Sequence, residues 1–124
     1  MNWKEIISKY PEAFFKLTCW LNEIEDPTED DRDLFLNYEW FYDNYLIAYD
    51  DFPWNLRNLY DFFDENEIYV EISVNDYIRT DGIVFKYEPI LYDTDWVFLG
   101  EYLTRTEAEE AAFERAFEIL ENKL

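Results

Sequence analysis

The clearest pattern of hydrophobic and polar positions lies in residues 55–74, where a helical spacing changes into the alternation of a strand. Four apolar residues recur at i, i+3, i+4 and i+7, the spacing of one helical face. From residue 68 the period falls to two, as in a strand. The pattern predicts a short amphipathic helix that leads directly into a strand at the edge of a sheet. The helical face consists of Leu56, Leu59, Tyr60 and Phe63, and one strand face of Ile68, Val70, Ile72 and Val74.

Two helices are predicted before this segment, near the N-terminus. The first covers residues 2–8, and the second begins at Pro11, because proline suits the first turn of a helix. The second is expected to end at Asp26, since a residue that precedes proline is disfavoured in the helical region. Its apolar stripe includes Cys19, which we expect to be a buried structural thiol. The stripe is formed by Phe14, Leu17, Leu21 and Ile24.

Residues 28–54 combine aromatic and acidic side chains. Between Phe35 and Phe63, 12 of 29 positions are aromatic, which obscures the polarity of any single face. Thr28 and Asp31 can cap a helix, and the apolar spacing predicts one over residues 31–45. Residues 50–53 are expected to form the loop before the helix that begins near residue 55.

A first hairpin is predicted from the dipeptide Asp81–Gly82, a two-residue turn signal. A turn at this position pairs Thr80 with Ile83 and Ile72 with Leu91.

A second turn is predicted at Asp93–Thr94, and it pairs Leu91 with Trp96 and Phe85 with Tyr102. The two registers place the apolar residues of three strands on one face, which favours an antiparallel meander because a slip of one residue would scatter them. Pro89 has no N–H to donate in the middle strand, so we expect a bulge or a gap there. The predicted face contains Ile72, Val74, Ile78, Phe85, Tyr87, Leu91, Trp96, Phe98 and Tyr102.

The last helix has the strongest start signal. Thr104 or Thr106 can be its N-cap, each with a glutamate three residues later. Its inner stripe is predicted to contain Ala112, Phe113, Ala116, Phe117, Leu120 and Leu124. Together these patterns predict one α+β domain over residues 1–124, with N-terminal helices, a three-stranded antiparallel meander and a C-terminal helix packed on the sheet.

The net charge of the chain restricts its possible partners more than any motif does. The chain of 124 residues has 30 acidic and 10 basic residues, a net charge of −20. Residues 22–65 carry 14 acids and two bases, a net −12, so more than half of the excess lies in a third of the chain. Such a chain repels free nucleic acid and anionic membranes. One cysteine, no secretory signal pattern and no long apolar run favour a cytoplasmic protein without a membrane span.

Few kinds of catalysis are compatible with this composition. The chain contains no histidine, so it lacks the commonest general base and metal ligand. It has no phosphate-binding glycine loop and no nucleophile motif. The acidic run from Glu25 to Asp33 lacks the glycine turn and the terminal glutamate spacing of a calcium-binding loop. We therefore predict no enzymatic activity, no cofactor and no metal site, and a carboxylate-dependent enzyme is the least favoured hypothesis.

Twelve of the 14 acidic residues between 22 and 65 are candidates for binding a partner. Asp61, Asp64 and Glu65 fall in the last turn of a predicted helix, where the helix dipole favours cations instead. One interpretation is a solvated face that maintains solubility, and the other is a surface matched to a basic cleft on another protein. The candidate partner-binding residues are Glu25, Asp26, Glu29, Asp30, Asp31, Asp33, Asp43, Asp50, Asp51, Asp61, Asp64 and Glu65.

Two segments, NLRNLYDFFDENEIYVEI (55–72) and TRTEAEEAAFERAFEILENKL (104–124), resemble a family of small acidic proteins from phage and other bacterial mobile elements. The two segments cover 39 of the 124 residues and are scaffold motifs, and the block 28–54 is an addition to the common pattern. The family brings no established activity and no catalytic residues. The resemblance implies a setting, the conflict between a mobile element and its bacterial host.

These observations lead to two hypotheses of different classes. The first is a non-enzymatic acidic binding protein, such as a phage-type inhibitor, whose carboxylates compete with nucleic acid for the basic groove of a host or toxin protein. The second is an acidic chaperone or adaptor that holds an extended segment of a partner through a sheet edge or an apolar groove. Clustered exposed acids favour the first, and an exposed apolar patch or an open sheet edge favours the second.

Overall fold

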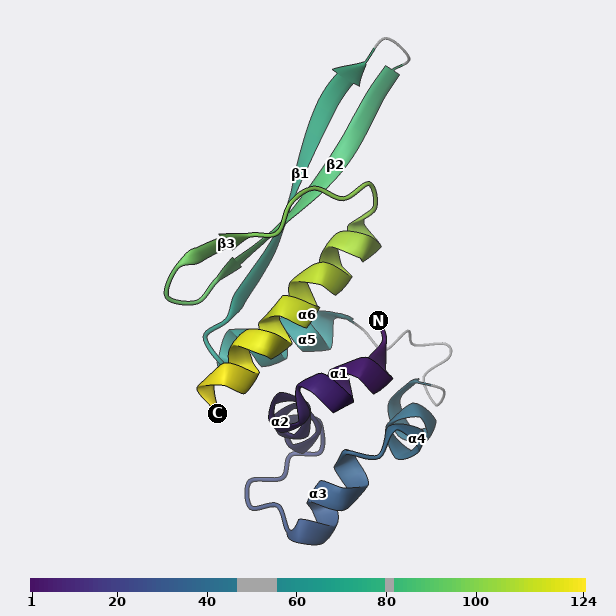
Figure 1. The fold of residues 1–124 in the computed structure, drawn as a ribbon, viewed down its shortest axis with the longest axis vertical. Coiled ribbons are helices and arrows are strands. Elements are labelled where there is room, and N and C mark those ends of the chain that lie inside the picture. The colour runs from purple at the N-terminus through teal and green to yellow at the C-terminus, as the bar shows by residue number, and fades with distance from the viewer. Residues whose placement is uncertain (47–55, 80–81) are drawn as a thin grey trace. The chain divides into compact units, whose positions relative to one another are not determined.

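The computed structural model describes residues 1–46, 56–79 and 82–124 (Figure 1). These residues form six α-helices, one π-helical segment and a three-stranded antiparallel sheet, so the predicted α+β class is confirmed. The chain divides into two compact units, residues 1–62 with 117–124 and residues 63–116. A single domain over residues 1–124 stays a prediction. The elements are α1 (Trp3–Lys9), α2 (Pro11–Leu21), α3 (Glu29–Phe35), α4 (Tyr38–Phe41), η1 (Tyr42–Leu46), α5 (Leu56–Glu65), β1 (Tyr69–Arg79), β2 (Gly82–Tyr92), β3 (Trp96–Phe98) and α6 (Arg105–Lys123).

The first helix begins at Trp3, one residue after its predicted start, and the second begins at Pro11 as predicted but ends earlier. The Asn2 side chain accepts from the Glu5 N–H, and Pro11 is the first residue of α2. The prediction that α2 continues to Asp26 is wrong, because Glu23 adopts a left-handed conformation (φ 54°) two residues after Leu21. The Ile24 N–H then bonds the Cys19 carbonyl at 3.0 Å, the closing bond of a Schellman motif.

The prediction of one helix over residues 31–45 is also wrong, since the chain there forms α3, α4 and η1. The interruption lies at Asn37, whose side chain accepts from the Trp40 N–H at 3.1 Å and starts a new helix. The predicted capping by Thr28 and Asp31 is confirmed, because each accepts from the other's backbone N–H.

The core of the first unit is aromatic. The Phe14 ring lies 4.9 Å from Phe41, and the Trp3 ring lies 5.2 Å from Phe41 and 6.0 Å from Phe117, measured between centroids. Phe14, Phe41 and Phe117 are fully buried. Each such side chain removes about 150–250 Å² from water, so these rings account for much of the stability of this unit.

Glu121, near the end of α6, caps the N-terminus of α2 from a distance in sequence. Its carboxylate accepts from the backbone N–H groups of Glu12, at 3.3 Å, and Ala13, at 2.7 Å. Tyr10, the residue in the N-cap position of α2, makes no side-chain cap bond. Glu121 therefore satisfies two N–H groups that have no partner within the helix.

The predicted passage from helix to strand is confirmed in α5 and β1. α5 ends with a second Schellman motif, in which Glu67 is left-handed (φ 60°) and the Ile68 N–H bonds the Phe63 carbonyl at 2.9 Å. Phe63 and Ile68, the two positions whose hydrophobic contact often accompanies this motif, are both fully buried. The chain turns within three residues and starts β1 at Tyr69.

The register between β1 and β2 differs from the prediction by two residues. Gly82 pairs with Arg79 as the first residue of β2, and Ile72 pairs with Pro89 and not with Leu91. Asp81, half of the predicted turn, lies outside the described residues. Because side chains alternate with a period of two, this shift leaves the predicted faces of β1 and β2 unchanged.

The register between β2 and β3 differs by one residue, which reverses the face of β3. Trp96 pairs with Tyr92 and Phe98 with Ile90, so the turn contains three residues, 93–95. Trp96 and Phe98 are 60% and 70% exposed on the face opposite to the predicted one. The prediction that both lie on the inner face is wrong.

The interruption predicted at Pro89 is present on the side of β3. The β2–β3 ladder stops at Ile90, and pairing resumes in an isolated bridge between Tyr87 and Tyr102. The predicted partner of Tyr102 was Phe85, so this pairing differs from the prediction by two residues. The Leu99 N–H still bonds the Pro89 carbonyl at 3.1 Å, because proline retains its acceptor.

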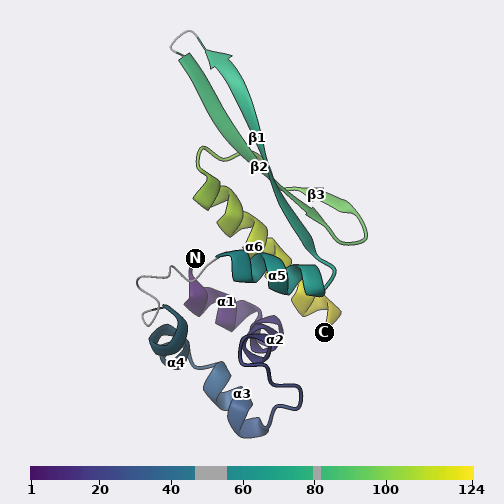
Figure 2. The same cartoon turned by 180° about the vertical axis from the view of Figure 1, so that it is seen from behind.

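The inner face of the sheet packs against α6, as predicted (Figures 1 and 2). Pro89 and Leu91 are buried on this face, and the Phe63 and Phe113 rings stack 6.0 Å apart. In both views the β1–β2 hairpin extends beyond the first turn of α6, and Val74 and Phe85 remain 48% and 54% exposed.

α6 begins at its predicted cap. The Glu107 N–H donates to the Thr104 hydroxyl at 3.2 Å, so Thr104 and not Thr106 is the N-cap. The predicted stripe is buried with one exception, Leu124, which is 57% exposed beyond the end of the helix.

Candidate partner-binding surface

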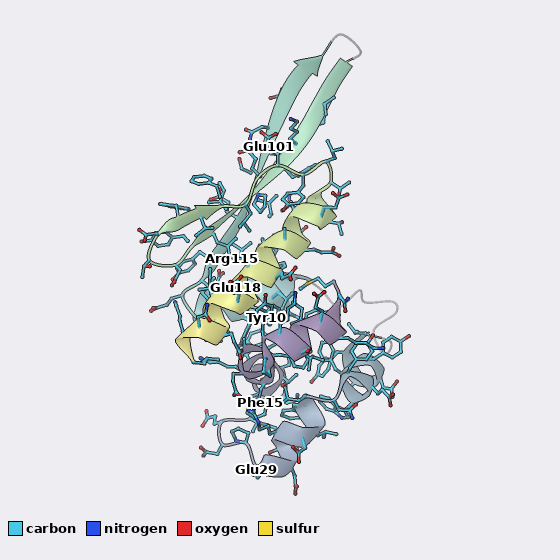
Figure 3. The ribbon with its side chains drawn as sticks, in the orientation of Figure 1. Tyr10, Phe15, Glu29, Glu101, Arg115 and Glu118 are labelled. Atoms are coloured by element: carbon cyan, nitrogen blue, oxygen red, sulfur yellow. The ribbon has the colours of Figure 1, made fainter. Side chains whose placement is uncertain are left out.

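Six of the twelve predicted partner-binding residues lie together in one segment of the first unit. We call residues 23–33 the acidic segment; it contains seven acids and one base, Arg32. It consists of the loop after α2 and most of α3. All of its carboxylate side chains except Asp31 are exposed, and Figure 3 shows Glu29 projecting outward from the first turn of α3. The predicted members are Glu25, Asp26, Glu29, Asp30, Asp31 and Asp33.

Folding itself accounts for three of these charges. Glu29, Asp30 and Asp31 form the first turn of α3, where the helix dipole stabilises anions, and Asp31 also completes the capping box with Thr28. These three charges therefore have a role in the start of α3, and their role in partner binding stays a prediction. Asp33 stands four residues after Glu29, a spacing at which like charges destabilise a helix by about 0.2–0.5 kcal/mol.

Arg32, the basic residue of the acidic segment, contacts α2. Both terminal nitrogens of Arg32 donate to the Glu12 carboxylate, Nη1 to Oε2 at 2.9 Å and Nη2 to Oε1. Its Cζ lies 5.1 Å from the centre of the Phe15 ring. The hydrogen bond from Arg32 lowers the pKa of Glu12, and the same bond raises the pKa of Arg32. Arg32 thus joins α3 to α2 through Glu12, a residue outside the acidic segment.

An open apolar groove borders the acidic segment, also within the first unit. Its volume is about 410 Å³, and its wall is mostly hydrophobic with charged side chains among the lining residues. Cys19 lines it and is 9% exposed, which confirms the predicted buried thiol. Burial, and secondarily the charge of Asp31, raises the pKa of Cys19, so the nucleophilic thiolate is disfavoured. The other apolar lining residues are Phe15, Trp20, Ile24, Pro27 and Leu124.

The remaining predicted residues belong to other elements. Asp43 is exposed on η1, and Asp61 is exposed on α5 in the first unit. Asp64 and Glu65 are exposed in the last turn of α5 and belong to the second unit. Asp50 and Asp51 lie outside the described residues. The ten described positions therefore come from several elements, and the acidic segment holds six of them.

Within the part of the chain that the structure describes, no group of three or more histidine, cysteine or acidic side chains is arranged to hold a metal ion. None of the described helices has the length and apolar character of a membrane span. No family model, curated protein or solved structure matches the chain.

Sequence reasoning missed a second surface, in the second unit. The one-residue shift of β3 places Trp96 and Phe98 beside Tyr69 and Tyr92 on the outer face of the sheet. All four are 36–70% exposed. The available signal was the run Asp93–Thr94–Asp95, which fits a three-residue loop as well as the two-residue turn that was predicted.

Proposed function

We propose that this protein is a non-enzymatic acidic binding protein that occupies a positively charged groove on another protein and thereby displaces nucleic acid. The observation that carries the proposal is the Arg32–Glu12 pair. In this pair the basic residue of the acidic segment binds a carboxylate of α2, outside the segment. Glu25, Asp26, Glu29, Asp30 and Asp33 remain exposed along one loop and one short helix.

Competition with nucleic acid is the mechanism that suits this arrangement. The backbone that carries the carboxylates is held by the Thr28–Asp31 capping box and by the Arg32–Glu12 pair, so little backbone entropy is lost when a basic partner binds. Attraction between opposite charges accelerates association and makes it sensitive to salt. The apolar groove beside the acidic segment offers a place for a hydrophobic anchor of the partner, which would add affinity that salt does not screen.

The resemblance to phage and mobile-element proteins supports the conflict between a mobile element and its bacterial host as the setting for this proposal. The partner would then be a nucleic-acid-handling protein of the bacterial host or a nuclease toxin, whose basic groove normally binds phosphates. The partner's chemistry follows from the charge of the acidic segment, and the setting follows from the resemblance.

A matched pair of variants tests the proposal. The triple variant Asp26→Asn, Asp30→Asn, Asp33→Asn reduces the acidic segment by three charges and leaves the Asp31 cap intact. The control Asp76→Asn, Glu107→Gln, Glu114→Gln removes three exposed charges elsewhere. Each protein is immobilised and exposed to the heparin-binding fraction of a bacterial lysate at low and at high salt.

We expect the wild type and the control to retain a basic protein at low salt, and the acidic-segment variant to lose it. The retained protein is then bound to labelled duplex DNA, and addition of the wild type should release the DNA, as fluorescence anisotropy would show. Equal capture by both triple variants, or a ternary complex with DNA, would contradict the proposal.

The second hypothesis, an acidic chaperone or adaptor, is favoured by the exposed aromatic residues of the sheet and by the edge position of β1. It predicts that one polypeptide is retained regardless of salt. The outcome of the same capture experiment therefore separates the two hypotheses.

A further inference from the structure

Three aromatic side chains form a row across the outer face of the sheet. Tyr69 of β1 pairs with Tyr92 of β2, which pairs in turn with Trp96 of β3. The ring centroids lie 6.3 Å apart for Tyr69 and Tyr92 and 4.8 Å apart for Tyr92 and Trp96. Phe98 lies two residues beyond Trp96 on the same face of β3. We call Tyr69, Tyr92, Trp96 and Phe98 the aromatic row.

The row is not part of the core of the second unit. α6 packs on the sheet, whose inner face contains the buried residues Pro89 and Leu91. Tyr69, Tyr92, Trp96 and Phe98 are 47%, 36%, 60% and 70% exposed. With roughly 200 Å² for each aromatic side chain, the row exposes about 400 Å². A patch of this size matches the largest apolar patches of ordinary monomers, which are often functional.

The charges around the row select the kind of ligand. Glu71 follows Tyr69 on the same face of β1, and Asp95 directly precedes Trp96; both are exposed. Lys86, on the same face of β2, bonds Glu101 at 2.9 Å, and Figure 3 marks Glu101 beside the hairpin. The neighbourhood of the row is thus negative, which attracts a cation.

A flat cation suits aromatic rings flanked by carboxylates. An arginine guanidinium stacks on Trp and Tyr faces and forms two parallel hydrogen bonds with a carboxylate, whereas a lysine ammonium does neither as well. Rows of aromatic residues on sheets also bind single-stranded nucleic acid, but those sites combine the rings with basic side chains that contact phosphates. Glu71 and Asp95 would repel phosphates.

We propose that the aromatic row binds an extended, arginine-bearing segment of a partner protein. Guanidinium groups lie on the Tyr92 and Trp96 rings, and Glu71 and Asp95 supply the carboxylates. Extended chains present every second side chain on one side, which matches the row of rings across neighbouring strands. This surface lies in the second unit and does not depend on the acidic segment of the first.

The test uses two short labelled peptides in which arginine or lysine alternates with serine. Fluorescence anisotropy measures their binding to the full chain. The wild type should bind the arginine peptide more tightly than the lysine peptide of equal charge. Trp96→Ala should weaken the arginine peptide about threefold to tenfold, and Trp96→Phe by less. Phe85→Ala, which removes a 54% exposed ring from the other face of the sheet, should leave binding unchanged.

A second pair of variants keeps the test valid if Trp96→Ala does not fold. Glu71→Gln with Asp95→Asn should weaken the arginine peptide more than Asp76→Asn with Glu107→Gln, which removes the same charge from other exposed positions. The triple variant of the acidic segment should weaken it no more than its own matched control, which separates this inference from the proposed function.

Several results would overturn the inference. Equal affinity for the two peptides, together with no effect of Trp96→Ala, would mean that only the overall negative charge attracts them. Tighter binding of a single-stranded oligonucleotide than of the arginine peptide would assign the row to nucleic acid. A wild-type dimer that Trp96→Ala dissociates in sedimentation equilibrium would assign it to a second copy of the chain.

Discussion

Glu121 carries one of the excess negative charges of a chain with a net charge of −20, yet its removal should destabilise the protein. General self-repulsion predicts the opposite sign, since the loss of any acid reduces the net charge. The local structure outweighs this effect, because the Glu121 carboxylate accepts from the N–H groups of Glu12 and Ala13 at the start of α2.

The magnitude follows from these two bonds. The bond from Ala13, at 2.7 Å, is short and partly buried, whereas the bond from Glu12, at 3.3 Å, is long and exposed. A hydrogen bond to a charged group contributes about 1.5–3 kcal/mol, and the helix dipole adds about 0.3–1 kcal/mol. After relief of self-repulsion we expect Glu121→Ala to lower the free energy of unfolding by about 1–2 kcal/mol. Glu121→Gln, which keeps one acceptor oxygen, should lower it by about half as much.

Urea denaturation followed by circular dichroism measures these differences, because urea does not screen charges. Glu25→Gln removes an equal charge from an exposed loop position and should be neutral or slightly stabilising at low salt. Asn122→Ala, at the exposed neighbouring position of α6, controls for helix propensity. Added salt should abolish any gain from Glu25→Gln and leave most of the loss from Glu121→Ala. If the Glu121→Ala and Glu25→Gln variants had the same free energy of unfolding, the assignment of Glu121 as the cap of α2 would be refuted.

Two further predictions concern a helix end and an ion pair. Glu67→Gly should raise the free energy of unfolding by about 1 kcal/mol, because glycine adopts φ 60° without the steric cost that glutamate bears there. Glu67→Gln controls for the loss of charge in the same urea titration. An equal gain in stability from both variants would contradict the steric reason. Arg32→Ala should cost up to about 1 kcal/mol near neutral pH, since exposed ion pairs contribute little. Arg32 lowers the folded-state pKa of Glu12, so the contribution is present above the ordinary value of 4.5 and is lost as the pH falls through the folded pKa. The stability curves of wild type and Arg32→Ala should therefore converge in acid, and a difference that grows there would contradict the pairing.

Local signals in the sequence determined where most helices begin. Pro11, Thr28 and Thr104 mark starts that the structure confirms, because capping involves residues that are only a few positions apart. The change from α5 to β1 was predicted correctly for the same reason, because it too depends on side-chain spacing among near neighbours. The period of two also fixed the faces of β1 and β2, although their register was two residues off.

Where helices end depended on less specific signals. Glu23 and Glu67 occupy left-handed positions that usually contain glycine, so the sequence did not mark the end of α2. Asn37, which divides the region predicted as one helix, is compatible with a helix interior as well as with a cap.

The sequence by itself determined the α+β class, most of the helix starts, the faces of β1 and β2 and the large excess of negative charge. The tertiary structure alone decided that Arg32 contacts Glu12, that Glu121 caps α2, and that Trp96 faces outward. The physical reason is the distance along the chain over which each interaction acts. Caps and side-chain periodicity involve near neighbours, whereas ion pairs between helices and the register of β3 depend on which distant segments fold against each other.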